Sequence, residues 1–193
     1  MATTNFNFTF ATSPLSMESV TVKDKRFVIS IHSETIQNRV KQLAAQMNED
    51  LKGSKPLFLC VLKGSILFAA DIFREINMEA EISFIRVSSY SGTESTGTVR
   101  SVAGISDPIE GRTVVILEDI VDTGDTAVYL LDEIKKQNPA KVLFAAFLFK
   151  PAALRQEVKL DYVGFEVPND FLVGYGLDYD GFGRNLKDIY QLA

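Results

Sequence analysis

The sequence predicts an α/β protein in which a central, mainly parallel and twisted sheet is flanked by helices. Continuous apolar runs at residues 56–62, 114–117 and 141–149 are typical of strands that are buried on both faces. The first two runs are followed by segments with helical apolar spacing, at 65–76 and after Thr126. Strands that alternate with helices favour parallel pairing through right-handed crossovers.

Composition is that of an ordinary globular protein. The chain has 193 residues, 46% hydrophobic and 23% charged, with a net charge of −5, so we expect one domain. The sequence shows no basic stripe of the kind that binds nucleic acid, and no apolar run approaches the length that spans a membrane. The single cysteine, Cys60, lies in an apolar run and is interpreted as a buried, inert thiol; with the single histidine, His32, it cannot complete a structural zinc site.

The amino-terminal half is expected to run as follows. Residues 1–17 carry no charged side chain and lack the features of a secretory or transit peptide, so we expect a disordered tail and a cytoplasmic protein. A short strand is predicted at 26–31, and a helix capped by Ser33 runs to about Leu51. A strand follows at 80–88. Residues 88–100 are rich in Ser, Thr and Gly and are expected to form a mobile loop, after which 99–105 return as a strand.

The carboxy-terminal part is expected to form short strands at 162–166 and 172–177. We expect residues 18–193 to be a single domain, in which 18–32 and 151–193 make a small subdomain, the hood, over the edge of the sheet.

The stretch 113–126 carries the strongest functional signal. A buried strand runs into Glu118, Asp119 and Asp122, followed by a turn with Gly124 and a helix. Open α/β sheets bind ligands at this edge, and backbone N–H groups at a helix start hold phosphate. Adjacent carboxylates suit vicinal hydroxyls or Mg²⁺, so a ribose phosphate fits. One alternative interpretation of this stretch is the Walker B strand of a nucleotide hydrolase, but the sequence has no G-x-x-x-x-G-K-[ST] motif to accompany it. The other alternative is that the acids are simply solvated turn residues.

Several further residues are ambiguous by themselves. Lys63-Gly64-Ser65 follows a buried strand and opens a helix, which suits a second anion site or a plain turn. Lys150 ends a strand and would ordinarily be solvated. Taken alone, Phe171 would be a core residue, and Asp178 and Arg184 would be surface charges.

These pieces together resemble a known family. The segment 118–126 resembles the phosphoribosyl pyrophosphate motif of type I phosphoribosyltransferases. Leu62-Lys63-Gly64-Ser65, Ser89-Tyr90, Lys150 and the block from Asp161 to Arg184 resemble its hypoxanthine-guanine branch. The resemblance covers roughly residues 20–190 and implies the type I phosphoribosyltransferase fold, with a hood and a flexible loop.

The resemblance also implies roles for individual residues. Asp122 would be the catalytic base, and Mg²⁺ would be the cofactor, held by Glu118, Asp119 and Asp178. Lys150 would read the purine O6, Phe171 would stack on the base, and the peptide Leu62–Lys63 would be cis. The implied substrate-binding residues are Lys63, Gly64, Ser89, Tyr90, Glu118, Asp119, Asp122, Thr123, Gly124, Asp125, Thr126, Lys150, Phe171, Leu172, Asp178 and Arg184.

The implied reaction transfers phosphoribosyl from phosphoribosyl pyrophosphate to N9 of hypoxanthine or guanine, in a homodimer or homotetramer. Two alternatives stay open: an RNA-binding, nucleotide-sensing regulator with the same fold, and an enzyme that prefers xanthine. One departure stands out, because relatives often carry a basic or neutral residue where this chain has Asp125. An acid there either serves the helix amino terminus or points to solvent.

Overall fold

The computed structural model describes residues 18–90, 99–103 and 107–193, and for 88–90 and 99–103 it describes the backbone alone. The expected tail at 1–17 therefore lies outside the described residues. Of the expected loop at 88–100, both ends are strand, and 91–98 lie outside the described residues.

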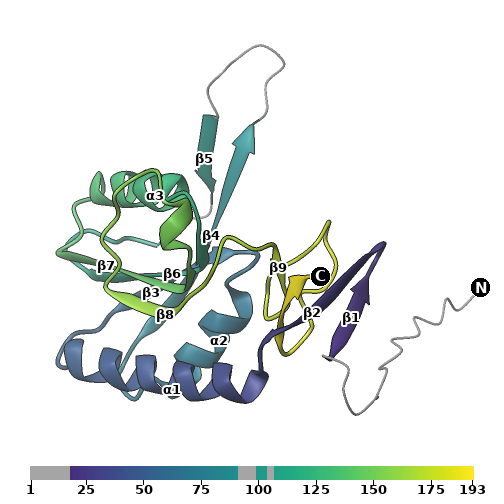
Figure 1. Ribbon diagram of the computed structural model, residues 1–193. Coiled ribbons are helices and arrows are strands. Elements are labelled where there is room, and N and C mark those ends of the chain that lie inside the picture. Colours follow the sequence, from purple (N-terminus) through teal and green to yellow (C-terminus); the bar gives the residue numbers. More distant parts are fainter. Residues whose placement is uncertain (1–17, 91–98, 104–106) are drawn as a thin grey trace, which may run out of the picture.

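A six-stranded sheet forms the centre of the protein, in the order β5-β4-β3-β6-β7-β8 (Figure 1). All neighbouring pairs are parallel except β4 and β5, which form an antiparallel hairpin at one edge. This arrangement confirms the predicted fold class. The strands are β3 (Leu57–Leu62), β4 (Glu81–Tyr90), β5 (Val99–Ala103), β6 (Thr113–Val121), β7 (Lys141–Phe149) and β8 (Tyr162–Glu166).

Helices cover both faces of this sheet, which explains the continuous apolar runs. Helices α1 (Ser33–Asp50) and α2 (Ile66–Glu75) lie on one face, and α3 (Asp125–Lys135) lies on the other (Figure 1). Successive side chains of β6 enter the two cores in turn: Val115 and Leu117 pack with α1 and α2, whereas Val114 and Ile116 pack with α3. A short 3₁₀ helix, Pro151–Ala153, follows β7.

A second, antiparallel sheet of order β1-β2-β10-β9 forms the hood beside the larger sheet (Figure 1). Its strands are β1 (Ser19–Val22), β2 (Lys25–Ile31), β9 (Leu172–Val173) and β10 (Ile189–Leu192), so both ends of the described chain build it. The predicted range 151–193 begins too early, because β8 pairs with β7 in the larger sheet. The predicted strand at 172–177 also stops after Val173, where the chain turns at Gly174.

The predicted cap of α1 is wrong. Ser33 is the first residue of the helix and makes no side-chain cap; its N–H instead donates to Oδ1 of Asp188 at 2.6 Å. The buried Asp188 carboxylate also accepts from the Tyr190 hydroxyl at 3.4 Å. The carboxylate of a distant residue thus occupies the favourable position at the helix amino terminus and ties the hood to the larger sheet's layer of helices.

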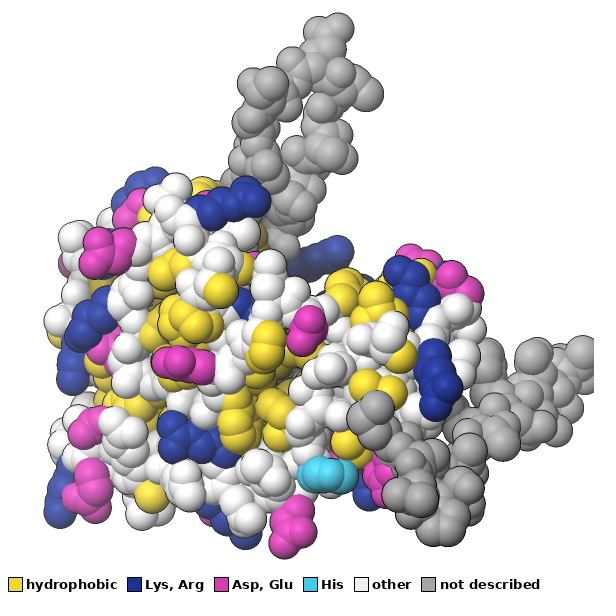
Figure 2. Space-filling model, viewed as in Figure 1, with side chains coloured by type: hydrophobic (Ala, Val, Ile, Leu, Met, Phe, Trp, Pro, Cys, Tyr) yellow, Lys and Arg dark blue, Asp and Glu magenta, His cyan; other side chains and the backbone are white. Residues whose placement is uncertain are grey.

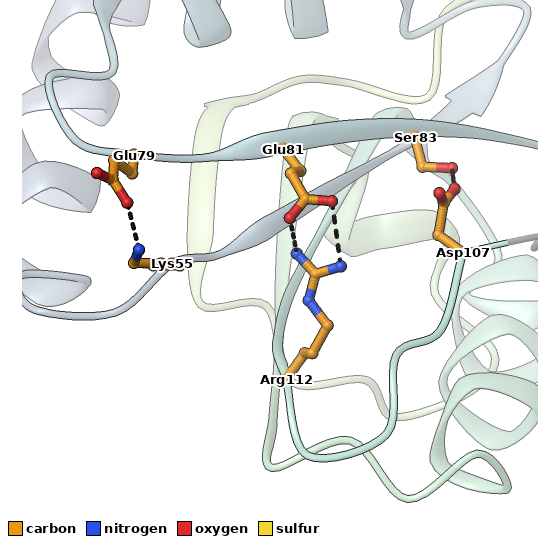
Figure 3. Close-up of polar contacts among 6 residues, drawn as sticks. All are labelled: Lys55, Glu79, Glu81, Ser83, Asp107 and Arg112. Carbon is orange, nitrogen blue, oxygen red and sulfur yellow. Dashed lines mark hydrogen bonds and ion pairs between the residues drawn. The ribbon is translucent and has the colours of Figure 1, made fainter.

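Two exposed ion pairs and one partly buried hydrogen bond hold the amino edge of the sheet together (Figure 3). Arg112, just before β6, forms a two-pronged ion pair with Glu81 at 2.8 and 3.3 Å. The Ser83 hydroxyl donates to Asp107, and Lys55 pairs with Glu79. These contacts lie where the strands begin, at the edge opposite the candidate site, and such exposed pairs contribute little stability each.

Charges of both signs are scattered over the face drawn in Figure 2, with no gathering of basic side chains there. Among the described residues, no helix is both long and apolar enough to cross a membrane.

Candidate active site at the carboxyl edge of the sheet

The predicted site residues converge at the carboxyl ends of three adjacent strands, β3, β6 and β7. Lys63-Gly64 follows β3, Asp122–Thr126 links β6 to α3, and Lys150 follows β7. After β3 the chain proceeds to β4 on one side, and after β6 it proceeds to β7 on the other. This reversal between β3 and β6 is the switch point at which open α/β sheets bind ligands.

Two adjacent carboxylates, the buried Glu118 and the partly buried Asp119, lie near the carboxyl end of β6. Glu118 is only 8% exposed, and its Oε2 is buried without a hydrogen-bond partner. Burial raises the pKa of Glu118 well above its usual value, and the charge of Asp119 adds to this shift. Burial also raises the pKa of Asp119, although its own backbone N–H, that of Ile120 and the Arg184 charge oppose the rise. The pair therefore presents acceptor oxygens to a ligand that brings hydroxyls or a cation.

The acid pair fits Mg²⁺ in its chemistry. Mg²⁺ takes oxygen ligands and is usually held through one or two carboxylates together with substrate phosphates and water. The buried, unpartnered oxygen of Glu118 is an available acceptor of this kind. Within the described part of the chain, no three acidic, His or Cys side chains gather to hold a metal by themselves, so the predicted third member, Asp178, does not join the pair in one cluster.

The turn between β6 and α3 forms a pocket of about 70 Å³. Gly124 precedes the helix with φ of 84°, and a Cβ on it would lie 2.7 Å from the carbonyl oxygen of Gln156. Glycine is therefore required both for the left-handed turn and for the close approach of the backbone at Gln156. The pocket is lined by Glu118, Ile120, Val121, Asp122, Thr123, Gly124, Thr126 and Ala127.

Asp125 is the first residue of α3 and serves the local structure. Its Oδ2 accepts from the Thr123 hydroxyl at 3.0 Å, and its N–H donates to the same hydroxyl oxygen at 3.4 Å. A carboxylate in the first turn also interacts favourably with the helix dipole. Of the two interpretations of Asp125, the contacts favour the one in which it serves the helix amino terminus.

Lys150 and Asp122 face each other across the ends of β7 and β6. Lys150 is 7% exposed, and its ammonium lies 3.1 Å from Oδ2 of Asp122, whose side chain is 46% exposed. Parallel pairing aligns Val121 with Phe149, which brings the residues after each strand together. A buried cation and a half-exposed acid thus stand side by side at the carboxyl edge of the sheet.

The loop after β3 packs directly on the acid pair. A Cβ on Gly64 would lie 1.6 Å from Oδ2 of Asp119, so the sequence requires glycine at this point. The Leu62–Lys63 peptide is cis, as the family resemblance implies. The loop then leads into α2 through the buried Ser65, whose hydroxyl donates to the Val61 carbonyl at 2.6 Å.

Four of the predicted site residues, Phe171, Leu172, Asp178 and Arg184, lie in the hood. Phe171 is 47% exposed and packs edge-on against Tyr179 with ring centroids 5.9 Å apart, whereas Leu172 is buried in β9. Arg184 pairs with Asp178 at 2.5 Å and donates to the Gly176 carbonyl at 2.6 Å. Ser89 and Tyr90 end β4, and their side chains lie outside the described residues.

Two supporting segments were missed by the sequence reasoning. The N–H groups of Arg155 and Gln156 both donate to the Thr123 carbonyl, at 2.9 and 3.1 Å, and so brace the turn between β6 and α3. A Cβ on Gly176 would lie 1.9 Å from the Gly64 carbonyl oxygen, so the hood rests on the loop after β3. The paired glycines of Gly174-Tyr175-Gly176 were the available signal for this second contact.

Comparison with known proteins agrees with this geometry. Residues 31–180 match the model of the phosphoribosyl transferase domain. The chain belongs to the phosphoribosyltransferase family. Among curated relatives of this phosphoribosyltransferase, the hypoxanthine-guanine phosphoribosyltransferase of Streptococcus thermophilus is 42% identical over 159 residues, which cover 82% of this chain and 88% of the relative. The enzyme of the same name from Bacillus subtilis is 39% identical over 162 residues, 83% and 90% of the two chains.

Solved structures give the same family. A hypoxanthine-guanine phosphoribosyltransferase from Bacillus anthracis superposes with a TM-score of 0.79 and 36% identity, over 86% of this chain and 96% of that one. The hypoxanthine phosphoribosyltransferase from Trypanosoma cruzi was solved as a lysine-to-arginine mutant in a ternary substrates complex. It superposes with a TM-score of 0.80 and 35% identity, over 86% of this chain and 94% of that one. The resemblance seen in the sequence and the predicted type I fold are thereby confirmed.

Proposed function

We propose that this phosphoribosyltransferase acts in purine salvage, transferring the phosphoribosyl group of phosphoribosyl pyrophosphate to N9 of hypoxanthine or guanine. The observation that carries the proposal is the Lys150–Asp122 pair, 3.1 Å apart, beside an acid pair and a phosphate turn. In the reaction the anomeric C–O bond to pyrophosphate breaks and a C–N bond to the base forms. The products are IMP or GMP and pyrophosphate.

The sugar phosphate would be held at the end of β6. The hydroxyls of Thr123 and Thr126 and the backbone N–H groups at the start of α3 suit the 5-phosphate. Glu118 and Asp119 would accept hydrogen bonds from the ribose hydroxyls, which gives the buried Oε2 of Glu118 a donor. The acid pair would thus bind the ribose hydroxyls, and the same carboxylates are suitable ligands for a cation.

Departure of pyrophosphate requires positive charge near the anomeric carbon. Lys63 and Arg184 lie on the loops next to Asp119 and would bind the leaving group, with Asp178 orienting Arg184. Mg²⁺, held by the acid pair, would neutralise further charge on the leaving group. The sugar would pass through an oxocarbenium-like state, as in glycoside chemistry.

The purine would bind between Phe171 and the Lys150–Asp122 pair. The Lys150 ammonium can only donate, so it suits the O6 carbonyl of a 6-oxopurine and leaves an adenine amino group without an acceptor. Asp122 would accept the proton from the imidazole part of the base as the new bond forms. Ser89 and Tyr90, at the end of β4, would cover the site and exclude water.

The test measures steady-state rates for hypoxanthine, guanine, xanthine and adenine, each with and without Mg²⁺. We expect activity with the first two that depends on Mg²⁺, and very little with adenine. Lys150→Ala should lose purine discrimination while Glu81→Gln, at the opposite edge of the sheet, should behave as wild type. Absence of transfer to any 6-oxopurine by folded protein would refute the proposal.

We also propose a cytoplasmic homodimer or homotetramer. Two large apolar side chains, Ile66 of α2 and Phe84 of β4, are each 45% exposed and would be covered in such an assembly. The buried free thiol of Cys60 is compatible with a reducing compartment. Light scattering during size exclusion would give the mass, and a monomer at micromolar concentration would contradict the assembly.

A further inference from the structure

A three-residue segment of the hood lies between the two proposed ligand sites. Gly174–Gly176 follows Phe171 and Leu172 almost directly along the chain. At its other end it rests on the loop after β3, because a Cβ on Gly176 would lie 1.9 Å from the Gly64 carbonyl oxygen. A shift of this segment would therefore move the surface on which Lys63-Gly64 is packed.

The segment has an unfavourable backbone conformation. The φ angles of Gly174, Tyr175 and Gly176 are 99°, 46° and 100°. The left-handed region is readily accessible to glycine, but a bulky residue such as tyrosine adopts it only when the surrounding structure holds it there. The contacts of the Tyr175 side chain must therefore fix the segment in place.

Those contacts reach into α2. The Tyr175 ring is buried and packs on Phe147, with centroids 4.9 Å apart. Its hydroxyl donates to Oδ2 of Asp71 at 2.7 Å, and the same oxygen accepts from Nε2 of Gln37 at 2.6 Å. Burial first, and then the Asp71 carboxylate, raise the pKa of the Tyr175 phenol, so the hydroxyl remains a donor at working pH.

Asp71 lies on the helix that the Lys63-Gly64 loop opens. Helix α2 begins at Ile66, directly after the loop, and Asp71 occupies its second turn. The Tyr175 hydrogen bond thus fixes the hood segment relative to the same helix that carries the loop. The Lys63-Gly64 loop is thus connected to the hood segment in two ways. It continues along the chain into α2, whose Asp71 binds Tyr175, and it packs directly against Gly176.

We propose that Asp71 and Tyr175 are positioning residues, whose hydrogen bond sets the conformation of the Lys63-Gly64 loop and couples it to the purine-contacting segment. The ligand of that loop, pyrophosphate or the pyrophosphate part of the sugar donor, rests on the proposed function. The mechanical coupling itself rests only on the contacts of the hood segment. Neither residue touches the substrate in this proposal.

The chain offers a matched control. The Tyr162 hydroxyl of β8 donates to Asp50, at the far end of α1, at 3.1 Å, and Tyr162 is also buried. Tyr175→Phe and Tyr162→Phe each remove one oxygen from a buried tyrosine–aspartate hydrogen bond. Only the first of these bonds connects to the Lys63-Gly64 loop.

The first measurement is ligand affinity and steady-state kinetics with the full chain. Tyr175→Phe and Asp71→Ala should raise the KM for the sugar donor and the dissociation constant of pyrophosphate about 3- to 10-fold, with a smaller effect on kcat. Asp71→Asn keeps an acceptor oxygen and should restore most of the affinity. The double variant Tyr175→Phe/Asp71→Ala should be no worse than either single one, and Tyr162→Phe should leave both constants unchanged.

The second measurement is hydrogen exchange of residues 62–67 without ligand. Tyr175→Phe should speed exchange there, and Tyr162→Phe should not. Unchanged exchange and affinity in Tyr175→Phe, or equal changes in Tyr162→Phe, would overturn the coupling. If Tyr175→Phe does not fold, the contrast between Asp71→Asn and Asp71→Ala decides in the same way. If Lys63→Ala keeps full pyrophosphate affinity, the proposed ligand of the loop is wrong, whereas the exchange result still tests the coupling.

Discussion

Replacing Asp122 by Asn tests the proposed purine-binding pair, Lys150 and Asp122, by changing one charge at nearly constant shape. The Lys150 ammonium lies 3.1 Å from the Asp122 carboxylate, with 7% of Lys150 exposed and 46% of the Asp122 side chain exposed. At an effective dielectric constant of about 40, suited to a half-exposed pair, the charges attract by about 3 kcal/mol. The Asn oxygen still accepts a hydrogen bond, so we expect a net loss of about 1–2 kcal/mol in unfolding free energy.

The same substitution should act much more strongly on catalysis. Loss of the proposed catalytic base should lower turnover by about 10²- to 10⁴-fold. In the proposed function the sugar donor is held mainly by Glu118, Asp119 and the turn between β6 and α3, so its dissociation constant should change little. The stability loss corresponds to a drop in Tm of about 3–6 °C for a chain of this size.

The assay combines thermal unfolding, calorimetric titration with the sugar donor and single-turnover kinetics. Glu81→Gln is the matched control, because it neutralises an acid at the opposite edge of the sheet. The Glu81 side chain is 64% exposed and is paired with Arg112. That variant should lose less than about 0.5 kcal/mol and keep full turnover. Near-wild-type turnover of folded Asp122→Asn would remove Asp122 as the base, and an unchanged Tm would show that the charge pair contributes nothing.

Three further substitutions test other parts of the site. Lys150→Gln should lower the ratio of kcat/KM for hypoxanthine over adenine, because an amide can also accept; an unchanged ratio with both rates measurable would show that Lys150 does not read O6. Glu118→Gln should weaken sugar-donor binding yet raise Tm. Burial raises the pKa of Glu118 in the folded protein, so its charge destabilises the fold increasingly as pH rises above the unfolded value of about 4.5. The gain in Tm from Glu118→Gln should therefore vanish below that pH. A gain that does not depend on pH would contradict this account. Asp125→Lys should tighten sugar-donor binding several-fold at low salt, with a gain that shrinks as salt rises, as KM measured across ionic strength would show. Loss of activity in folded Asp125→Lys would show that the contact between Asp125 and Thr123 does more than place an acid in the first turn of α3.

The central part of the site was predictable because it is local in sequence. Val114–Leu117 is too apolar for a solvated segment, and the acids that follow it directly must lie at the carboxyl end of the strand. The glycine before α3 then fixes the turn. By contrast, the Lys150–Asp122 contact spans 28 positions and depends on β7 lying next to β6 in parallel register. Periodicity alone does not give the order of strands.

The hood was less predictable because its elements are short and come from both ends of the chain. β1 has four residues and β9 has two, too few to establish an alternating pattern. Asp188 looks like a surface charge in the sequence, yet folding places it at the amino terminus of α1. Such a cap is invisible locally, because the donor and the acceptor are 155 positions apart.

Three features that are unfavourable for the unliganded fold lie at the carboxyl edge of the sheet and in the adjoining hood. They are the unpartnered oxygen of Glu118, the buried ammonium of Lys150 and the left-handed backbone of Tyr175. The amino edge instead carries exposed ion pairs such as Arg112–Glu81, which leave no buried charge uncompensated. A ligand with hydroxyls, a carbonyl and phosphate would satisfy the polar groups at the carboxyl edge, so substitutions that relieve them should gain stability and lose affinity together. At the amino edge neither quantity should change by much, and this asymmetry follows from physical chemistry without reference to the family.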